Sequence, residues 1–389
     1  MNKIFCDLKS LNLQILFVPV PERLRIFIEC LIVSCFLSST ALQGQILKDT
    51  ASINLLKKGV DDIYDLRFEN AREVSRKLNQ SFPGHPVVYL LNGMITYWEN
   101  YPLIPSSSLR SSYENDLRTC IRLCEKNYDA DNYPEYLLSN LGSRGLLLLF
   151  YADNNLSENV FPLAKSTYRY IRQSFDYSIY YSDFYFFTGL YNYYREAYPD
   201  AHPVYKVLAI FFPKGDRVKG LMELQTAAKN SIMLKAESSS FLSHIYINFE
   251  TNYQQAFNFS KFLHELYPAN PEYLSVYIRN MLLIKKYDEA ENLIRLSDNK
   301  TDNPYFQSQL AVFNGILQEK KYNNNVLAQK YYNQGINDLS LFGYYGNEYA
   351  AYAYFGLSRI SDINGDRQNK KTYRKKAIEL TNYKKVNFD

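Results

Sequence analysis

The histidines in the body of the chain are the first candidates for chemistry, because imidazole acts as a general base and as a metal ligand near neutral pH. His85 and His202 each precede a proline, which favours loop positions for both. His244 and His264 fall on successive predicted helices, where Glu265 could join them in a metal site. The run FLHEL around His264 lacks the second histidine of a zinc-protease helix. We therefore interpret His244 and His264 as ordinary helix residues and expect no metal.

Cysteines, acidic residues and loop motifs add no catalytic signal. Cys120 and Cys124 lie one helical turn apart, where helix geometry disfavours an unstrained disulfide, so both are predicted to be small core residues. Asp61, Asp62 and Asp65 are predicted to form a solvated helix face. The sequence contains neither a P-loop nor a nucleophile-elbow motif. We expect no enzymatic activity, no catalytic residue and no cofactor.

The bulk composition is that of a globular protein with an excess of tyrosine. The 389 residues are 47% hydrophobic and 22% charged, and they include 37 Tyr beside 24 Phe and a single Trp. The formal net charge is only +4, whereas binding to a phosphate backbone needs concentrated positive potential. We therefore expect no nucleic-acid partner.

Residues 1–44 are predicted to be a leader rather than part of the fold. Arg23 and Arg25 precede the apolar stretch 26–42, which has the length of a signal peptide and ends among small residues. A cleaved leader of this kind would direct export of the protein to the periplasm or the outer membrane. Two alternatives stay open: a lipoprotein acylated at Cys35, with peripheral membrane association, and an uncleaved anchor.

An internal repeat with a period near 34 residues decides the predicted fold. An aromatic residue, an alanine three places later and a proline twelve to fourteen places after the alanine recur along the chain. The instances are Phe68, Ala71 and Pro83; Tyr253, Ala256 and Pro268; and Tyr287, Ala290 and Pro304. Such spacing indicates one structural unit that stacks on copies of itself.

This pattern resembles the tetratricopeptide repeat, in which two antiparallel helices cross at small residues and a proline closes the unit. The resemblance implies an all-α, right-handed superhelical solenoid of about eight irregular helix hairpins. Crossing helices approach to about 8–10 Å only where one of them contributes little side chain. The predicted repeat-packing positions are Gly59, Ala71, Pro83, Gly93, Gly142, Gly189, Gly220, Ala256, Pro268, Ala290, Ala328, Gly356 and Ala377.

Beyond the leader, three regions are predicted. N-terminal repeats occupy 45–175, an irregular aromatic-rich unit occupies 176–235, and C-terminal repeats occupy 236–389. The last helix is basic and is predicted to cap the solenoid, with Tyr373 and Ala377 on its inward stripe. The alternative is that its basic face binds an anionic partner.

The segment 175–198 holds twelve aromatic side chains, which at helical spacing cover most sides of a helix. This predicts packing between neighbouring units; the alternative is a ligand groove. The candidate groove residues are Tyr177, Tyr181, Tyr185, Tyr191, Asn192 and Tyr194. Asp216 is predicted to cap the helix that follows. The block is similar to one in exported bacterial tetratricopeptide proteins and, more distantly, in the eukaryotic family linked to inclusion-body clearance and lipid droplets.

These features predict a non-enzymatic, exported scaffold or adaptor that binds a protein or peptide partner on the concave face of the solenoid. The alternative is a carrier that holds a glycan or lipid in the tyrosine-rich central units. Convergence of the 177–194 tyrosine hydroxyls on an open pocket would favour the carrier, and their burial between units would favour the scaffold. The identity of the partner and the oligomeric state stay open.

Overall fold

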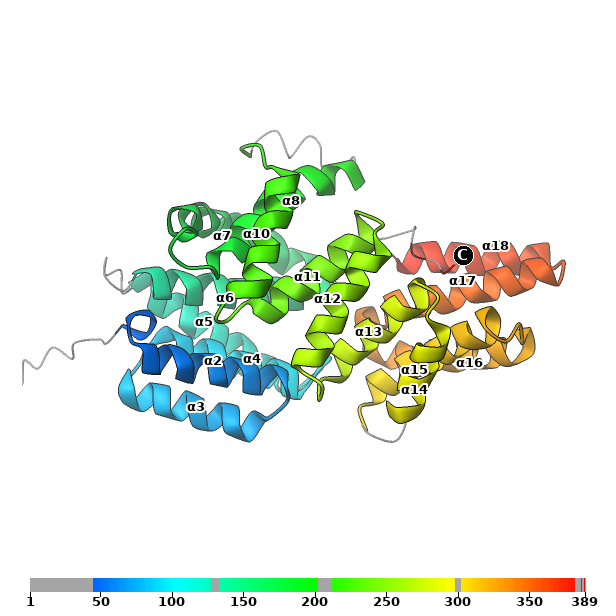
Figure 1. Cartoon of the computed structure of the whole chain (residues 1–389), viewed down its shortest axis with the longest axis horizontal. Coiled ribbons are helices and arrows are strands. Elements are labelled where there is room, and N and C mark those ends of the chain that lie inside the picture. Colours follow the sequence, from blue (N-terminus) through cyan, green and yellow to red (C-terminus); the bar gives the residue numbers. More distant parts are fainter. Residues whose placement is uncertain are drawn as a thin grey trace, which may run out of the picture. The chain divides into compact units, whose positions relative to one another are not determined.

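The fold is known from a computed structural model, which describes residues 45–126, 133–201, 212–297 and 302–381 together with Val386 and Phe388 (Figure 1). The chain divides into residues 1–44 and one compact unit over 45–389. The predicted leader with Cys35, the position His202 and the apolar segment up to residue 211 lie outside the described residues.

Helices make up the regular structure of the described residues, which contain no strand. The prediction of an all-α solenoid built from helix hairpins is therefore confirmed. Eight successive helix pairs are seen in these ranges: α2 (Thr50–Tyr64) with α3 (Phe68–Ser81), α4 (Pro86–Glu99) with α5 (Arg110–Lys126), α6 (Tyr133–Asp153) with α7 (Ser157–Tyr177), α8 (Phe184–Ala201) with α10 (Arg217–Asn230), α11 (Lys235–Asn248) with α12 (Tyr253–Leu266), α13 (Pro271–Leu283) with α14 (Tyr287–Ser297), α15 (Pro304–Lys320) with α16 (Asn325–Leu339), and α17 (Asn347–Ile363) with α18 (Arg367–Leu380). Short 3-10 turns, η1 (Ile46–Lys48) and η3 (Ser340–Gly346), precede α2 and α17.

Local sequence signals start many of these helices. The Asp216 side chain accepts a hydrogen bond from the backbone N–H of Lys219, so the predicted cap of α10 is confirmed. Asn270 and Asn303 cap α13 and α15 in the same way, and each is followed by a proline in the first turn. Among the described helices, none has the length and apolarity needed to cross a membrane.

The predicted repeat-packing positions lie at the contacts between helices or in the turns that join them. The exposed fraction is at most 1% for each of the five alanines, Ala71, Ala256, Ala290, Ala328 and Ala377. A Cβ on Gly59, Gly93, Gly142, Gly189, Gly220 or Gly356 would touch a side chain or the backbone of another helix. Pro83 and Pro268 are exposed, in the turns after α3 and α12. Small residues thus let the helices of this chain approach closely.

The first helix of the aromatic unit begins at Phe184, and Tyr177 is the last residue of α7, so the prediction of one helix over 175–198 is wrong for its first two turns. The reason is Asp183, whose buried carboxylate accepts backbone hydrogen bonds from Ile232, Met233 and Leu234 at 2.7–3.0 Å. Burial raises the pKa of Asp183, and these three N–H groups oppose that shift. The turn before α8 is therefore fixed by the start of α11, which lies about fifty residues further along the chain.

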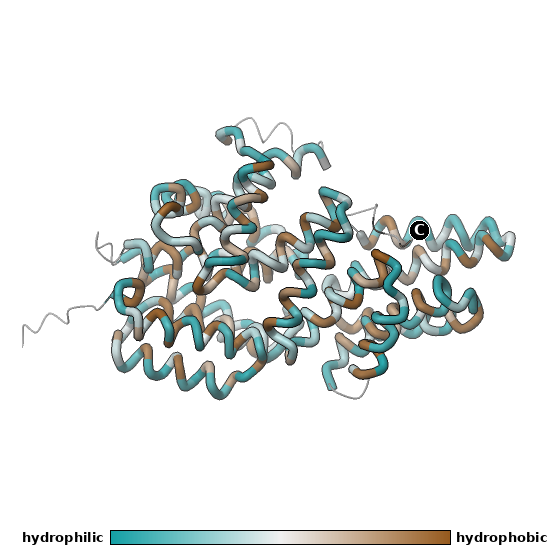
Figure 2. Tube along the Cα trace, viewed as in Figure 1, coloured by the Kyte–Doolittle hydropathy of each residue, from teal (hydrophilic) through white to brown (hydrophobic). Residues whose placement is uncertain are grey.

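The last hairpin ends the fold with a hydrophilic helix, α18 (Figure 2). Its inward stripe is as predicted: Ala377 is buried, and Tyr373 stacks on Tyr354 of α17 at 6.1 Å between ring centroids. Lys371 and Arg374 are exposed. The solvated face is what a terminal helix of a stacked array needs.

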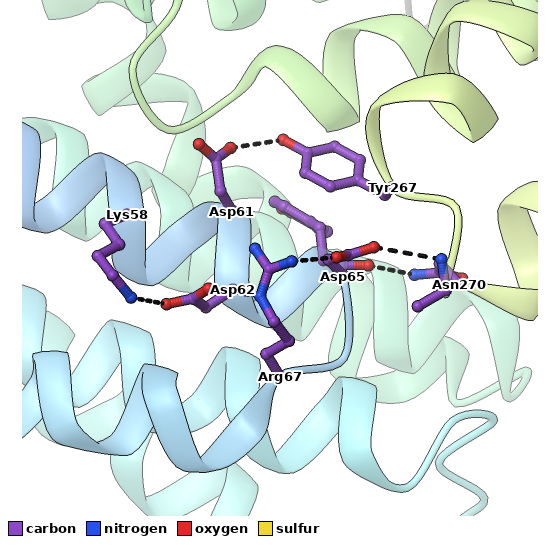
Figure 3. Close-up of polar contacts among 9 residues, drawn as sticks. Lys58, Asp61, Asp62, Asp65, Arg67, Tyr267 and Asn270 are labelled. Atoms are coloured by element: carbon purple, nitrogen blue, oxygen red, sulfur yellow. Dashed lines mark hydrogen bonds and ion pairs between the residues drawn. The ribbon is translucent and has the colours of Figure 1, made fainter.

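The end of α2 also contacts the turn between α12 and α13, about two hundred residues away (Figure 3). The Tyr267 hydroxyl donates to Asp61 Oδ1 at 2.8 Å, and the Asn270 side-chain amide donates to the carbonyl of Tyr64 at 2.9 Å. Asp65 accepts a hydrogen bond from the backbone N–H of Ala269, in the same turn, at 3.2 Å. We call this set, Asp61, Tyr64, Asp65, Tyr267 and Asn270, the closure contact. The hairpins therefore touch beyond their sequence neighbours, unlike the units of a linear solenoid.

The predicted solvated acidic face on α2 is wrong for the same reason. Asp62 is only 3% exposed and pairs with Lys58 and with Arg67 Nε at 2.7 Å (Figure 3). Asp61 and Asp65 both accept hydrogen bonds in the closure contact. Tertiary contact supplies the partners of Asp61 and Asp65, whereas Asp62 pairs with cations four and five residues away in the chain. In each case a partner offsets the free-energy cost of removing the carboxylate from water.

Aromatic rings extend this contact toward the C-terminal hairpins. Trp98 packs against Tyr64, Tyr101 and Tyr273 at centroid distances of 5.2–5.6 Å. Tyr101 in turn packs edge-on against Tyr345 at 5.8 Å. The single tryptophan therefore belongs to the interior between α2, α4 and α13, where edge-to-face pairs add to the area that is buried.

Candidate functional site

The described residues line a cavity of about 330 Å³ between α4, α6, α7, α8 and α11, which is partly open to solvent. This volume falls in the range of about 300–1,000 Å³ that is usual for small-molecule sites. The side chains that line it are almost all aliphatic or aromatic. They are Leu90, Met94, Leu138, Leu141, Gly142, Gly145, Leu146, Leu148, Leu149, Ala152, Thr167, Ile171, Phe186, Phe187, Leu190, Met233, Leu234, Glu237 and Phe241.

Helix α6 provides one continuous face of this cavity. Its lining residues recur every three or four positions from Leu138 to Ala152, which is the spacing of one side of a helix. Two glycines lie on this face and behave differently. A Cβ on Gly142 would lie 3.1 Å from Leu90, whereas a Cβ on Gly145 would meet nothing within 4 Å. Gly145 therefore contributes open volume, and Ala152 is the lining residue exposed to solvent.

Helix α11 contributes the ionisable group of the lining, Glu237. It lies on the same helix face as Leu234 and Phe241, which are also lining residues. The side chain is partly buried, and its Oε2 atom is inaccessible to water and has no hydrogen-bond partner. Burial raises the pKa of Glu237 to about 8, although its position in the first turn of α11 favours the charged form. At neutral pH this carboxyl is an uncharged acid.

The groups around Glu237 are neutral phenols rather than cations. Electrostatic interaction links Glu237 with Tyr267 and Tyr273, and burial raises the pKa of both tyrosines. The neighbouring Tyr64 hydroxyl is also buried without a hydrogen-bond partner. Its ring lies 6.2 Å from that of Tyr273, which interacts electrostatically with Glu237.

A second, polar set of groups is contributed by the end of α6 and by α11, α13 and α17. The Arg279 guanidinium on α13 donates to Glu348 Oε1 at 3.1 Å, and its Nε atom has no partner. Burial raises the pKa of Asp153 and of Glu272 to about 7, and it lowers the pKa of His244 to about 4. These groups interact electrostatically with one another, and none of them lines the apolar cavity.

Another cavity, of about 540 Å³, lies between α5, α6 and α7. Its polar side chains are engaged with one another: Tyr170 donates to Glu125 at 2.8 Å, and Arg144 donates to the same carboxylate oxygen at 2.8 Å. Tyr133 donates to Gln173 across the opening. We assign no ligand to this space, because its lining is already paired.

The six predicted groove residues do not line either cavity. The Tyr191 hydroxyl donates to the carbonyl of Pro213 at 2.7 Å, and Asn192 donates to Glu223 at 2.8 Å. Tyr177 and Tyr181 pack on Phe184, Tyr194 packs on Phe249, and Tyr185 is partly buried against the core. The tyrosine hydroxyls of this segment therefore do not converge on one pocket.

Three other residues of the same aromatic segment, Phe186, Phe187 and Leu190, do line the apolar cavity. Sequence reasoning missed these residues, and it also missed Gly145 and Glu237. For the α6 face, which includes Gly145, the sequence does contain a signal: one side of this helix carries leucines and two glycines over four turns. A glycine on an apolar helix face, however, indicates a close helix crossing as readily as an open cavity.

The histidines and cysteines take structural positions. His85 is buried at the start of α4, where it accepts the backbone N–H of Val87 and meets Glu135 at 3.2 Å. His244 is hydrogen-bonded to Asn248 on its own helix. His264 of α12 stacks on the ring of Tyr277 of α13. Within the described ranges no group of three His, Cys, Asp or Glu side chains is arranged to hold a metal. Cys120 and Cys124 are buried free thiols, as predicted.

Comparisons with protein-family models, with curated protein sequences and with solved structures find no match to this chain. The resemblance to tetratricopeptide proteins stays a prediction from the residues themselves. Function has to be argued from the chemistry of the cavity.

Proposed function

We propose that this protein binds a small apolar molecule in the cavity between α4, α6, α7, α8 and α11, without acting on it chemically. The observation that carries the proposal is a lining of aliphatic and aromatic side chains that contains one carboxyl group, Glu237. Burial of apolar ligand surface supplies affinity of about 25 cal/mol per Å², and a single polar group fixes orientation. This is the carrier hypothesis, moved from the tyrosines to the face of α6.

The size of the cavity favours a small molecule or one alkyl chain over a protein segment. One turn of an α-helix, about 10 Å across and 5.4 Å long, fills roughly 400 Å³. The cavity measures about 330 Å³ and so holds less than one such turn. The local packing of the 177–194 tyrosines favours the predicted scaffold role, with its protein partner and its location in the cell envelope, over a tyrosine-lined ligand groove. The apolar lining near α6 is a separate observation, and it specifies a class of ligand.

The experiment is a titration of the purified full chain with N-phenyl-1-naphthylamine, a neutral apolar dye that fluoresces in apolar surroundings. The matched variants are Gly145→Leu, which places a side chain in the open volume, and Ala51→Leu, which places the same side chain at an exposed position in the first turn of α2, away from the described lining residues. We expect saturable binding, weakened at least about tenfold by Gly145→Leu because the occupied volume is lost, and unchanged in Ala51→Leu. Absence of saturable binding, or equal binding by both variants, would contradict the proposal.

A further inference from the structure

We infer that the ligand of this cavity is an uncharged alkyl-chain molecule that carries a hydroxyl or carbonyl oxygen, and that the Glu237 carboxyl binds this oxygen. The inference rests on the proposed function and adds the chemical class of the ligand and the residue that reads its head group. It starts from the position of Glu237, which lies on the cavity face of α11 between Leu234 and Phe241.

The first step is hydrogen-bonding capacity. Glu237 Oε2 has no partner in the protein and almost no accessible surface, so a ligand oxygen reaches it only after the carboxyl group turns about its terminal torsion, which is broad and two-fold. A buried polar atom without a partner costs free energy, and a ligand atom that pairs with it recovers that cost. Thr167, the other polar side chain of the lining, already donates to the carbonyl of Leu163 at 2.7 Å. Among the described lining residues, Glu237 is therefore the group with capacity to spare for a ligand.

The second step is charge. Helices α6 and α8 face Glu237 with leucines and phenylalanines, and the titratable groups that interact with it are the phenols of Tyr267, at the end of α12, and Tyr273 of α13. Among the lining residues that the structure describes there is no lysine, arginine or histidine. An anionic head group would find no cation there. Because burial raises the pKa of Glu237 to about 8, the carboxyl carries a proton at neutral pH and can donate a hydrogen bond to a neutral oxygen.

The third step excludes an amine. A cationic head group would require the ionised carboxylate, and both ions would lose hydration in an apolar cavity. The described lining residues also offer no cation that would neutralise the carboxylate. A neutral oxygen acceptor satisfies the acid without this cost. The chain of the ligand then extends along the face of α6 toward Gly145.

The test is displacement of bound N-phenyl-1-naphthylamine at pH 6.5 by three ligands with the same ten-carbon chain: 1-decanol, decylamine and decanoate. We expect 1-decanol to bind at least about tenfold more tightly than the other two. Within a series of 1-alkanols, affinity should rise about fourfold per methylene until the cavity is full, which follows from the burial of one methylene.

The variants separate a head-group contact from a structural role. Glu237→Gln keeps a neutral hydrogen-bonding side chain, so it should bind 1-decanol within about threefold of the wild type and lose the decline in affinity above pH 8. Glu237→Leu should weaken 1-decanol at least about fivefold while it still binds the dye. Glu265→Gln, at an exposed position on α12, is the control for loss of a carboxylate and should change nothing.

Three results would overturn the inference. Tightest binding of decylamine, lost in Glu237→Gln, would show that the carboxylate pairs with a cation. Equal binding of all three head groups to the wild type and to Glu237→Leu would show that Glu237 does not contact the ligand. Failure of the dye to bind the wild type would overturn the proposed function together with the inference, whereas the first two results leave the proposed function standing.

Discussion

Two glycine-bearing helix faces in this molecule have opposite surroundings. Helices α8 and α10 cross at Gly189 and Gly220, where a Cβ on Gly220 would lie 2.6 Å from the backbone nitrogen of Tyr193. Helix α6 carries Gly145, where an added Cβ would meet nothing within 4 Å. At the first position the missing side chain lets two backbones touch. At the second it leaves volume that no neighbour fills, and that volume is part of the proposed ligand site.

The comparison teaches that a small residue on a helix face has no single structural meaning. Whether it closes a crossing or opens a cavity depends on how near the facing helix comes, which is decided elsewhere in the fold. For α11 the distance is set partly by Asp183, which holds the backbone of residues 232–234 at the start of that helix. Glu237 follows one turn later on the cavity face.

The largest effect is expected where the glycines are in contact. Gly220→Leu should lower the free energy of unfolding by about 3–4 kcal/mol, because the backbones of α8 and α10 would have to separate. Gly145→Leu should change the free energy of unfolding by less than about 1 kcal/mol, since the added side chain enters open space. Urea denaturation followed by circular dichroism measures both. Equal losses in the two variants would remove the distinction between the two faces.

A smaller effect concerns pH and sharpens the account of the cavity. The pKa of Glu237 is raised to about 8 in the fold from an ordinary value of 4.5, so the native state retains a proton that the unfolded chain releases between these values. The free energy of unfolding therefore falls as pH rises through this window and levels off above pH 8. Allowing for the partial exposure of the side chain, we expect a contribution of about 2 kcal/mol.

The measurement is the difference in unfolding free energy between the wild type and Glu237→Gln at pH 5, 7 and 9. Asp153 and Glu272 contribute slopes of the same sign and His244 contributes the opposite sign at lower pH, but all three are common to both proteins. The wild type should lose stability relative to the variant as pH rises. A constant difference across this range would show that Glu237 is not held in its acid form.

The smallest effect is a gain. Gly145→Ala should raise the free energy of unfolding by about 0.5–1 kcal/mol, because alanine costs less backbone entropy than glycine in a helix and the methyl group has room. The dye should still bind, since one methyl group occupies little of the cavity. Destabilisation by this substitution would mean that the open volume beside Gly145 is absent in solution.

Much of the hairpin architecture could be predicted from short-range patterns. Residues such as Ala256 and Ala290 recur at a fixed interval, and Asp216 lies where a helix cap is needed, so both signals are contained in a few neighbouring residues. The closure contact could not be predicted in this way. Asp61 looks like a solvated acid on its own helix, and its partner Tyr267 lies about two hundred residues away.

The cavity shows the same limit for function. The sequence drew attention to the tyrosines of the central unit because they are numerous, yet the structure engages Tyr191 and Asn192 in local hydrogen bonds and turns Phe186, Phe187 and Leu190 to the open space. Helix periodicity identifies the apolar faces of α6, α8 and α11. It does not say whether those faces meet or stand apart.

Helix capping and the recurrence of alanines at the crossings follow from the order of residues, since each depends on a short stretch of chain. Most helix boundaries do so too, but the start of α8 does not, because Asp183 is bound by residues about fifty positions away. The closure contact, the protonated state of Glu237 and the space beside Gly145 arise only when distant helices are brought together. Burial changes the free energy of a charge or of an empty volume through everything that surrounds it, and those surroundings come from all parts of the chain.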